Sequence, residues 1–214
     1  MKSVLIIGLG RFGRHMAKKL IEQGDEVLAV DINEQRADNA VSFIDNIQIG
    51  NATDEGFIET LGVGNFDLCV VAIGDNFQAA LEITVLLKDY GAKYILARAS
   101  REVHKKLLLR NGADHVVYAE REMAERLAVR YGANNLFDYI ELSDNIGIFE
   151  IGVPEGWAGK TIVQKAVRNR YNVSILATKT NGEIYPLPSP DHIFDEDETL
   201  LILADRKAIK ALIK

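Results

Sequence analysis

The chain has 214 residues, of which 48% are hydrophobic, and a formal net charge of −6. This length suggests one or two domains with a substantial core, and no apolar run approaches the length that a membrane span needs. The acidic balance argues against a nucleic-acid partner, because such binding rests on neutralising phosphates, and the lack of a leader-like N-terminal segment predicts a chain that is not exported.

The first element predicted along the chain is a buried strand, Val4–Ile7, that runs directly into a glycine-rich loop. Gly8, Gly10 and Gly13 have the GxGxxG spacing of dinucleotide-binding turns. In such a turn the first glycine allows the tight bend, the second lets the backbone approach a pyrophosphate, and the third lets the helix pack on the strand. The helix that follows would present free N–H groups and the positive end of its dipole to phosphates.

A second apolar strand, Val27–Val30, ends in Asp31, at the distance from the glycines where an acid contacts the ribose. Asp31 can accept hydrogen bonds from both ribose hydroxyls and would repel a 2′-phosphate. Arg11 opposes the dipole at the start of the first helix, at a cost of about 0.3–1 kcal/mol unless a phosphate offsets it. A third phosphate would do so better than a second, so Arg11 favours a ligand with more terminal charge than NAD. The alternatives are an arginine that faces solvent and a Rossmann scaffold with an empty crevice.

Residues 1–131 alternate between short strands and helices, which predicts an α/β domain with a Rossmann-like, doubly wound parallel sheet. The strands are mostly unalternated apolar runs, as expected when both sheet faces are covered. The predicted strands are Val4–Ile7, Val27–Val30, Ile47–Ile49, Leu68–Ala72, Tyr94–Arg98 and His115–Tyr118. The predicted helices are Arg11–Gln23, Glu34–Val41, Asp54–Leu61, Asn76–Tyr90, Arg101–Asn111 and Glu120–Tyr131, with starts at Thr53 or Asp54 and at Ser100 and stops at Gly24, Gly62, Gly91 and Gly112. Cys69 falls within a strand and is expected to be a buried, reduced residue rather than a nucleophile.

The regular alternation of predicted strands and helices ends at residues 132–135, which predicts a second, small α+β domain over residues 132–214. Its predicted strands are Phe137–Leu142, Ile146–Val153, Val173–Thr178, Glu183–Tyr185 and Thr199–Ala204, with a hairpin turn at Asn181-Gly182. Short helices are expected around Ile162–Val167 and Ala208–Ile213. A domain of this size supports only a small core, so we expect it to pair with another copy or to pack on a partner.

The loops that follow the later strands are candidates for the same site, because ligands of open α/β sheets bind beyond the carboxyl ends of the strands. These candidates are Asn51–Asp54, Ala72–Asn76 and Arg98. Small side chains at Ala52, Ala72 and Gly74 would let an adenine ring lie flat. The alternative is ordinary helix capping, and Glu120 would stabilise the start of its helix without any ligand.

Nothing in the sequence completes an enzyme active site. The histidines lack metal-ligand spacing and are expected at surface or packing positions, and no Ser-His-Asp arrangement is present. A nicotinamide dehydrogenase would need a second domain that supplies an acid–base residue and a substrate pocket, and the C-terminal part offers no such constellation. A non-enzymatic nucleotide sensor is therefore favoured. The alternatives are a small NAD-dependent oxidoreductase and a redox-sensing transcription factor built on the same crevice.

Several segments together resemble the RCK (KTN) domains of bacterial potassium-uptake regulators. In the N-terminal part these are Gly8–Gly13, Asp31, Gly50–Asp54, Val71–Asp75 and Ala119-Glu120. The segments Trp157–Ile162 and Asp195–Leu200 look like the C-terminal lobe of those proteins. The resemblance therefore covers the whole chain.

This resemblance implies a cytosolic, non-enzymatic gating subunit that forms a ring, typically an octamer, beneath a membrane-embedded potassium-translocating subunit. ATP, ADP or NAD(H) in the crevice would change the ring's shape. By matched position, Arg11 would sense the γ-phosphate, Asp31 would hold the ribose and Asn33 would lie near the adenosine. Glu120 would lie near the phosphates at a subunit boundary, where a divalent cation such as Mg²⁺ or Ca²⁺ can be shared. The remaining implied nucleotide-site residues are Gly8, Leu9, Gly10, Phe12, Gly13, Ile32, Asn51, Ala52, Thr53, Ala72, Ile73, Gly74 and Arg98.

The resemblance also implies a second ligand, because in many members of this family the C-terminal lobe binds cyclic di-AMP across a two-fold interface. The matching stretch here is residues 162–188. Arg168 and Asn172 would meet phosphate, while Ile162, Ile175 and Pro188 would flank adenine. An apolar dimer seam is the alternative explanation for the same residues.

Overall fold

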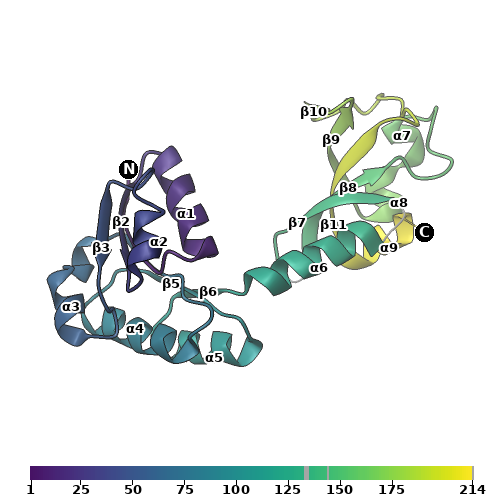
Figure 1. The fold of residues 1–214 in the computed structure, drawn as a ribbon. Coiled ribbons are helices and arrows are strands. Elements are labelled where there is room, and N and C mark those ends of the chain that lie inside the picture. The colour runs from purple at the N-terminus through teal and green to yellow at the C-terminus, as the bar shows by residue number, and fades with distance from the viewer. Residues whose placement is uncertain (133–134, 144, 214) are drawn as a thin grey trace. The chain divides into compact units, whose positions relative to one another are not determined.

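The computed structural model describes residues 1–132, 135–143 and 145–213 (Figure 1). The chain separates into two compact units, residues 1–122 and 123–214. The predicted end of the strand–helix alternation at residues 132–135 includes residues 133–134, which lie outside the described residues. The domain boundary between residues 131 and 132 stays a prediction.

The first unit is built on a six-stranded parallel sheet with the strand order β3-β2-β1-β4-β5-β6. Its strands are β1 (Ser3–Ile7), β2 (Glu26–Asp31), β3 (Asn46–Ile49), β4 (Leu68–Val71), β5 (Ile95–Arg98) and β6 (His115–Val117). The chain order reverses between β1 and β4, which is the switch point of a doubly wound sheet. This topology confirms the predicted fold class.

The helices predicted over residues 1–131 are all present, and the first five cover both faces of the sheet (Figure 1), whereas the sixth lies mostly in the second unit. They are α1 (Arg11–Glu22), α2 (Glu34–Asp38), α3 (Glu55–Thr60), α4 (Phe77–Asp89), α5 (Glu102–Arg110) and α6 (Ala119–Gly132), and a short 3-10 turn, η1 (Val63–Asn65), adds to the prediction. Asp54 caps α3 as predicted, and the four glycines predicted to end helices all have positive φ. The predicted start at Ser100 is wrong: α5 is preceded by Arg101, and the Ser100 hydroxyl lies 3.3 Å from His104 Nδ1.

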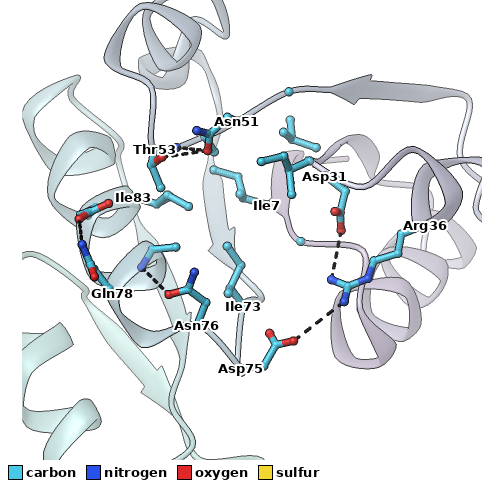
Figure 2. Close-up of a pocket in the computed structure, with 17 residues that line it drawn as sticks. Ile7, Asp31, Arg36, Asn51, Thr53, Ile73, Asp75, Asn76, Gln78 and Ile83 are labelled. Atoms are coloured by element: carbon cyan, nitrogen blue, oxygen red, sulfur yellow. Dashed lines mark hydrogen bonds and ion pairs between the residues drawn. The ribbon is translucent and has the colours of Figure 1, made fainter.

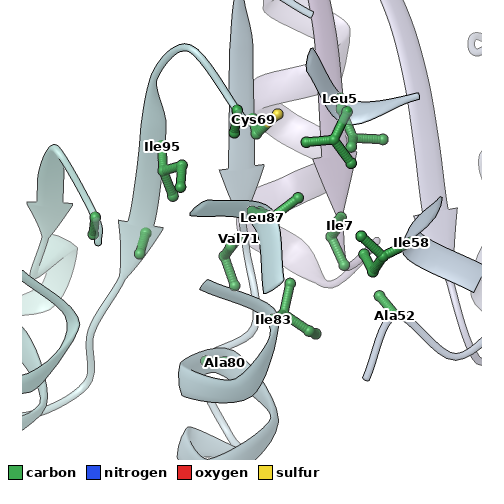
Figure 3. Packing of buried hydrophobic residues seen from close by; sticks show 14 of the residues in the cluster. Leu5, Ile7, Ala52, Ile58, Cys69, Val71, Ala80, Ile83, Leu87 and Ile95 are labelled. Carbon is green, nitrogen blue, oxygen red and sulfur yellow. The ribbon is translucent and has the colours of Figure 1, made fainter. Parts of the chain in front are cut away.

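Strand β1 shows why residues Val4–Ile7 are all apolar. Leu5 and Ile7 face a core that includes residues of α3, α4 and α5 (Figure 3), whereas Val4 and Ile6 face a second core on the side of α1 and α2. Both faces of the strand are therefore buried. Cys69 on β4 is fully buried, and this burial raises the pKa of its thiol to about 12. The thiol stays neutral, as expected of a packing residue.

The second unit contains a five-stranded antiparallel sheet with the order β10-β9-β11-β8-β7, which confirms the predicted α+β lobe. Its strands are β7 (Leu136–Glu141), β8 (Ile146–Gly152), β9 (Ser174–Thr180), β10 (Glu183–Pro186) and β11 (Thr199–Asp205), and its helices are α7 (Ile162–Lys165), α8 (Val167–Tyr171) and α9 (Arg206–Leu212). The Asn181-Gly182 hairpin turn is confirmed by positive φ at both residues. The short helix predicted around Ile162–Val167 is present as α7, but it ends earlier than expected because Ala166 adopts a left-handed φ of 47°, and the helix that follows, α8, was not predicted.

The core of this unit gathers around Trp157 and Phe194, whose rings lie 5.1 Å apart. Strand β11 places Leu200 and Ile202 in that core and alternates them with less buried residues, as a sheet with one covered face does. No helix among the described residues combines the length and the apolar character that crossing a bilayer requires.

Candidate functional site

Two cavities lie at the carboxyl edge of the parallel sheet, around the switch point between β1 and β4. The larger, of about 560 Å³, extends from the end of β1 toward β2, β3 and the start of α4 (Figure 2). The smaller, of about 380 Å³, surrounds the glycine loop and the loop after β4. Open α/β sheets bind ligands at this edge.

The three glycines of the loop have separable physical roles. Gly8 has a φ of +103°, and a side chain at Gly13 would place its Cβ 1.9 Å from the Gly8 carbonyl oxygen. Both glycines are therefore required by the fold, as the sequence predicted. Gly10 has an ordinary φ of −64°, and its Cβ would meet nothing within 4 Å. Its own conformation and packing do not require glycine, which leaves the approach of a ligand as its predicted role.

Helix α1 begins at this loop, and no side chain of its own first turn offsets the positive end of the helix dipole. Gly10 is the N-cap and supplies no side-chain acceptor, and the first turn contains no acidic residue. Arg11 and Arg14 both line the smaller cavity, and neither guanidinium group has a hydrogen bond, or an ion pair within 4 Å, to any residue that the structure describes. The positive end of the helix and two unpaired guanidinium groups thus share one space.

Asp31 is 4% exposed and ties the glycine loop to the end of β2. Its Oδ2 accepts a hydrogen bond from the Leu9 N–H at 2.6 Å, and its Oδ1 accepts one from the Asn33 N–H at 2.8 Å. Each carboxylate oxygen has a second acceptor position, and the residue lines the larger cavity. The contact with a ribose stays a prediction.

Arg36 lines both cavities and was missed from the sequence. Its Nη1 lies 3.9 Å from Asp31 Oδ2, and its Nη2 lies 3.9 Å from Asp75 Oδ2 (Figure 2). An arginine on a short, exposed helix gives no signal of such a position. Arg14 was also missed, although its spacing of three residues from Arg11 places both on one helix face.

Arg98 lies across the loop after β4. An added Cβ at Gly74 would lie 2.4 Å from Arg98 Nη1, so the space beside this glycine holds the guanidinium. The adenine contact predicted at Gly74 stays a prediction. Arg98 pairs with Glu120 and lies over the Phe12 ring, 5.8 Å from its centroid, while its buried Nε has no hydrogen-bond partner among the residues that the structure describes.

The Glu120 carboxyl has a lowered pKa. It accepts a hydrogen bond from its own backbone N–H, and the Arg98 and Arg11 guanidinium groups lie close enough to favour its charged form. The pair connects the end of β5 to the start of α6. Glu120 thus lies at the start of α6, where a carboxylate is stabilising without any ligand. It also lies beside two arginines of the smaller cavity, Arg98 and Arg11.

Most of the predicted nucleotide residues line the two cavities. The larger is lined by Gly8, Asp31, Ile32, Asn51, Ala52, Thr53 and Ile73, and the smaller by Gly8, Leu9, Gly10, Arg11, Ala72, Ile73, Gly74 and Arg98. Four predicted residues line neither. Phe12 packs against the core, Gly13 lies against Gly8, Asn33 caps α2 by accepting from the Arg36 N–H at 2.9 Å, and Glu120 pairs with Arg98.

The residues predicted to bind cyclic di-AMP lie in the second unit on several elements. Ile162 begins α7, Arg168 is exposed on α8, Asn172 follows α8 with a φ of 55°, and Ile175 is on β9. Pro188 follows β10. None of these residues lines the cavity of about 410 Å³ that this unit contains. Their ligand stays a prediction.

Two of the four histidines have packing or pairing roles, and His15 and His115 are exposed. The His104 ring stacks on Phe77 with 3.9 Å between centroids, and His192 Nε2 lies 2.9 Å from an oxygen of the buried Glu198. Across the described part of the chain, no group of three or more His, Cys, Asp or Glu side chains is placed to hold a metal ion. The cation predicted at Glu120 would draw ligands from a neighbouring subunit and stays a prediction.

Comparisons with known proteins agree with this architecture. Residues 4–119 match the TrkA-N domain and residues 146–214 match the TrkA-C domain. The chain is 37% identical over 202 residues to Ktr system potassium uptake protein C of Bacillus subtilis, covering 94% of this chain and 91% of that protein. It is 38% identical over 209 residues to Ktr system potassium uptake protein A of the same organism, covering 98% and 94%.

Two solved structures show the same fold. The GsuK channel bound to NAD superposes with a TM-score of 0.73 at 23% identity, over 100% of this chain and 39% of that one, so this chain spans less than half of the GsuK chain. The Kef CTD of Shewanella denitrificans in its AMP-bound form gives a TM-score of 0.50 at 29% identity, over 60% of this chain and 78% of that one. With both domain models matched in order and two relatives similar over nearly their whole length, the chain belongs to the family of TrkA-N/TrkA-C (RCK) domain proteins.

Proposed function

We propose that this chain is a nucleotide-sensing regulatory subunit of a Ktr- or Trk-type potassium uptake system. The potassium system is supported by the names of its relatives, which are Ktr system potassium uptake proteins. It would act at the cytoplasmic face, as part of a ring, typically an octamer, that contacts a membrane-embedded translocating subunit. Nucleotide binding would change the ring and thereby the transporter.

The observation that carries nucleotide binding is the charge of the smaller cavity. In a chain with a net charge of −6, this cavity gathers Arg11, Arg14, Arg36 and Arg98 around the glycine loop, with Asp75 as its one carboxylate. Guanidinium groups recognise phosphate oxygens with paired hydrogen bonds, each worth about 1.5–3 kcal/mol. The start of α1 adds its own dipole. A polyphosphate fits this chemistry better than a neutral ligand does.

The larger cavity suits the nucleoside part of such a ligand. It places Asp31 at its rim, where the carboxylate can accept from ribose hydroxyls, and it adds the apolar side chains of Ile7, Ile73 and Ile83. The AMP-bound Kef structure supports an adenine nucleotide as the ligand class. We propose ATP and ADP as the exchanging ligands, with NAD(H) as the alternative occupant.

Sensing requires that ATP and ADP favour different ring geometries, because a ligand that binds two states equally shifts neither. We assign the γ-phosphate to Arg11, whose guanidinium has no hydrogen bond or ion pair within 4 Å among the described residues and only a longer-range attraction to Glu120. A divalent cation, Mg²⁺ or Ca²⁺, would join the phosphates to Glu120. Cyclic di-AMP would bind the C-terminal lobe at Ile162, Arg168, Asn172, Ile175 and Pro188 and inactivate transport; an apolar seam between two copies is the alternative.

Calorimetric titration of the Arg11→Ala variant tests this function. We expect a loss of ATP affinity of about tenfold or more and a much smaller loss for ADP, since only ATP carries the phosphate that Arg11 senses. The matched control is Arg110→Ala on α5, an exposed arginine outside both cavities. Equal losses for ATP and ADP would remove Arg11 from sensing, and a wild-type chain that binds no nucleotide would refute the function itself.

The alternative of a small NAD-dependent oxidoreductase makes a different prediction. Hydride transfer needs an acid–base residue beside the nicotinamide; among the described residues neither cavity is lined by histidine, cysteine, tyrosine or lysine, so only the carboxylates Asp31, Asp75 and Glu82 could serve. Turnover of NAD(H) with a metabolite, lost in an Asp31→Ala variant, would favour the enzyme. Native mass spectrometry of the purified chain would report the size of the ring and any nucleotide that remains bound.

A further inference from the structure

The passage between the two cavities is bounded by a small set of residues. The cavities share Gly8, Ile73, Arg36 and Asp75 in their walls. Gly8 and Ile73 lie against each other, because a Cβ at Gly8 would be 3.1 Å from Ile73 Cγ1. Arg36 and Asp75 form the other shared pair, and Figure 2 shows the arginine reaching from α2 toward the loop after β4. A ligand that occupies both cavities must pass between these residues.

The Arg36 guanidinium is held loosely in this passage. It lies 3.9 Å from a carboxylate oxygen of Asp31 and 3.9 Å from one of Asp75, and it donates no hydrogen bond to any residue that the structure describes. The Asp75 side chain is 80% exposed, so solvent screens its attraction. The Arg36 guanidinium is thus attracted by the carboxylates of Asp31 and Asp75 but donates a hydrogen bond to neither of them.

We propose that Arg36 binds the phosphate attached directly to the nucleoside, and that Asp75 holds Arg36 in the empty site and competes with that phosphate. This inference rests on the proposed function and deepens it. With the nucleoside in the larger cavity and the terminal phosphates beside Arg11, the 5′-phosphate is the group that lies at the shared wall. Arg36 therefore selects 5′-phosphorylated nucleosides as a class, whereas Arg11 binds the terminal γ-phosphate and so distinguishes ATP from ADP.

A phosphate should bind Arg36 more strongly than Asp75 does, so it can replace Asp75 as the partner of Arg36. A phosphate can take two charge-assisted hydrogen bonds from a guanidinium group, whereas the present contact with Asp75 is an exposed ion pair at its outer limit of distance. Loss of Arg36 should therefore weaken binding of a nucleoside monophosphate about tenfold or more. Loss of Asp75 should strengthen it about two- to fivefold, because an exposed pair contributes no more than that.

A double-mutant cycle tests the proposal, with AMP and adenosine titrated calorimetrically into wild type, Arg36→Gln, Asp75→Asn and the double variant. We expect Arg36→Gln to weaken AMP and leave adenosine unchanged, and Asp75→Asn to strengthen AMP only while Arg36 is present. Asp38→Asn, an equal change of charge on α2 outside both cavities, is the control for Asp75→Asn. Both test positions lie at the surface, and circular dichroism confirms that each variant is folded.

The outcomes separate this inference from the function on which it rests. If wild type binds AMP but Arg36→Gln binds it equally well, the assignment of Arg36 is overturned while nucleotide binding stands. If Asp75→Asn strengthens AMP equally with and without Arg36, the competition is overturned, because the gain is then a general effect of charge. If wild type binds none of AMP, ADP, ATP and NAD, the proposed function is refuted together with this inference.

Discussion

The glycine loop allows a prediction in which two similar substitutions differ in their effect on stability. Gly10→Ala adds a methyl group that meets nothing within 4 Å, whereas Gly13→Ala adds one that would lie 1.9 Å from the Gly8 carbonyl oxygen. We expect Gly10→Ala to fold normally and to bind nucleotide poorly, because the methyl group occupies the space that a phosphate needs. We expect Gly13→Ala to lose stability and, with the loop displaced, binding as well.

The magnitudes follow from the local backbone. At Gly10, with φ −64° and ψ −175°, alanine is less favourable as an N-cap by roughly 0.5–1 kcal/mol but gains about 0.4–1 kcal/mol from a less flexible unfolded chain. The net change is near zero. At Gly13 alanine gains up to about 1 kcal/mol of helix propensity, yet a backbone oxygen must move by more than an ångström, which typically costs more than that gain. We expect a net loss of about 1–3 kcal/mol.

Urea denaturation followed by circular dichroism measures these changes, and ATP titration measures binding. The chain has one tryptophan, Trp157, buried in the second unit, so its fluorescence reports that unit alone. Gly13→Ala should shift the dichroism transition and leave the fluorescence transition unchanged. A Gly10→Ala variant that is destabilised by more than about 2 kcal/mol, or that binds ATP as wild type does, would refute the reasoning from open space beside this glycine.

Three further predictions follow from other contacts. Gly74→Ala should displace the Arg98 guanidinium and weaken ATP binding about tenfold in calorimetry, while Gly64→Ala, whose methyl group has only ordinary contacts, should bind as wild type does. Cys69, with its thiol pKa raised to about 12, should resist iodoacetamide at pH 8 in native protein and react in urea, as mass spectrometry would show; rapid native alkylation would contradict its burial. Thr161→Ala should remove the capping box of α7 and destabilise the second unit by about 0.5–2 kcal/mol in the Trp157 transition, and an unchanged midpoint would contradict this.

The elements that the sequence predicted correctly depend on local patterns. The apolar run before Gly8, the glycines that end helices and the Asn181-Gly182 turn each act within a few residues of where they stand. The break between α7 and α8 has no such marker. Ala166 adopts a left-handed conformation that alanine rarely takes, and only the packing of the second unit can impose it.

The residues of the candidate site also separate into those predictable from a local sequence pattern and those that depend on distant parts of the chain. The glycine motif and Asp31 are recognisable because their spacing in sequence is fixed by one strand–loop–helix–strand unit. Arg36 and the contact between Gly74 and Arg98 are not, because they depend on partners contributed by other strand ends: Asp75 for Arg36 and Arg98 for the glycine. Residue type and spacing along one segment cannot report which loops of a parallel sheet meet at its edge.

The arginines at the glycine loop explain how an acidic chain can hold a polyanion. Arg36 and Arg98 each lie within 4 Å of a carboxylate, whereas Arg11 has no ion pair of that length among the described residues and only a longer-range attraction to Glu120. The carboxylates therefore occupy part of the charge that a ligand would neutralise, and a ligand must bring enough negative charge to replace them. Each added phosphate meets less competition from protein carboxylates as it approaches Arg11. The preference for terminal charge that the sequence suggested from helix electrostatics thus has a second physical source in the pairing of the remaining arginines.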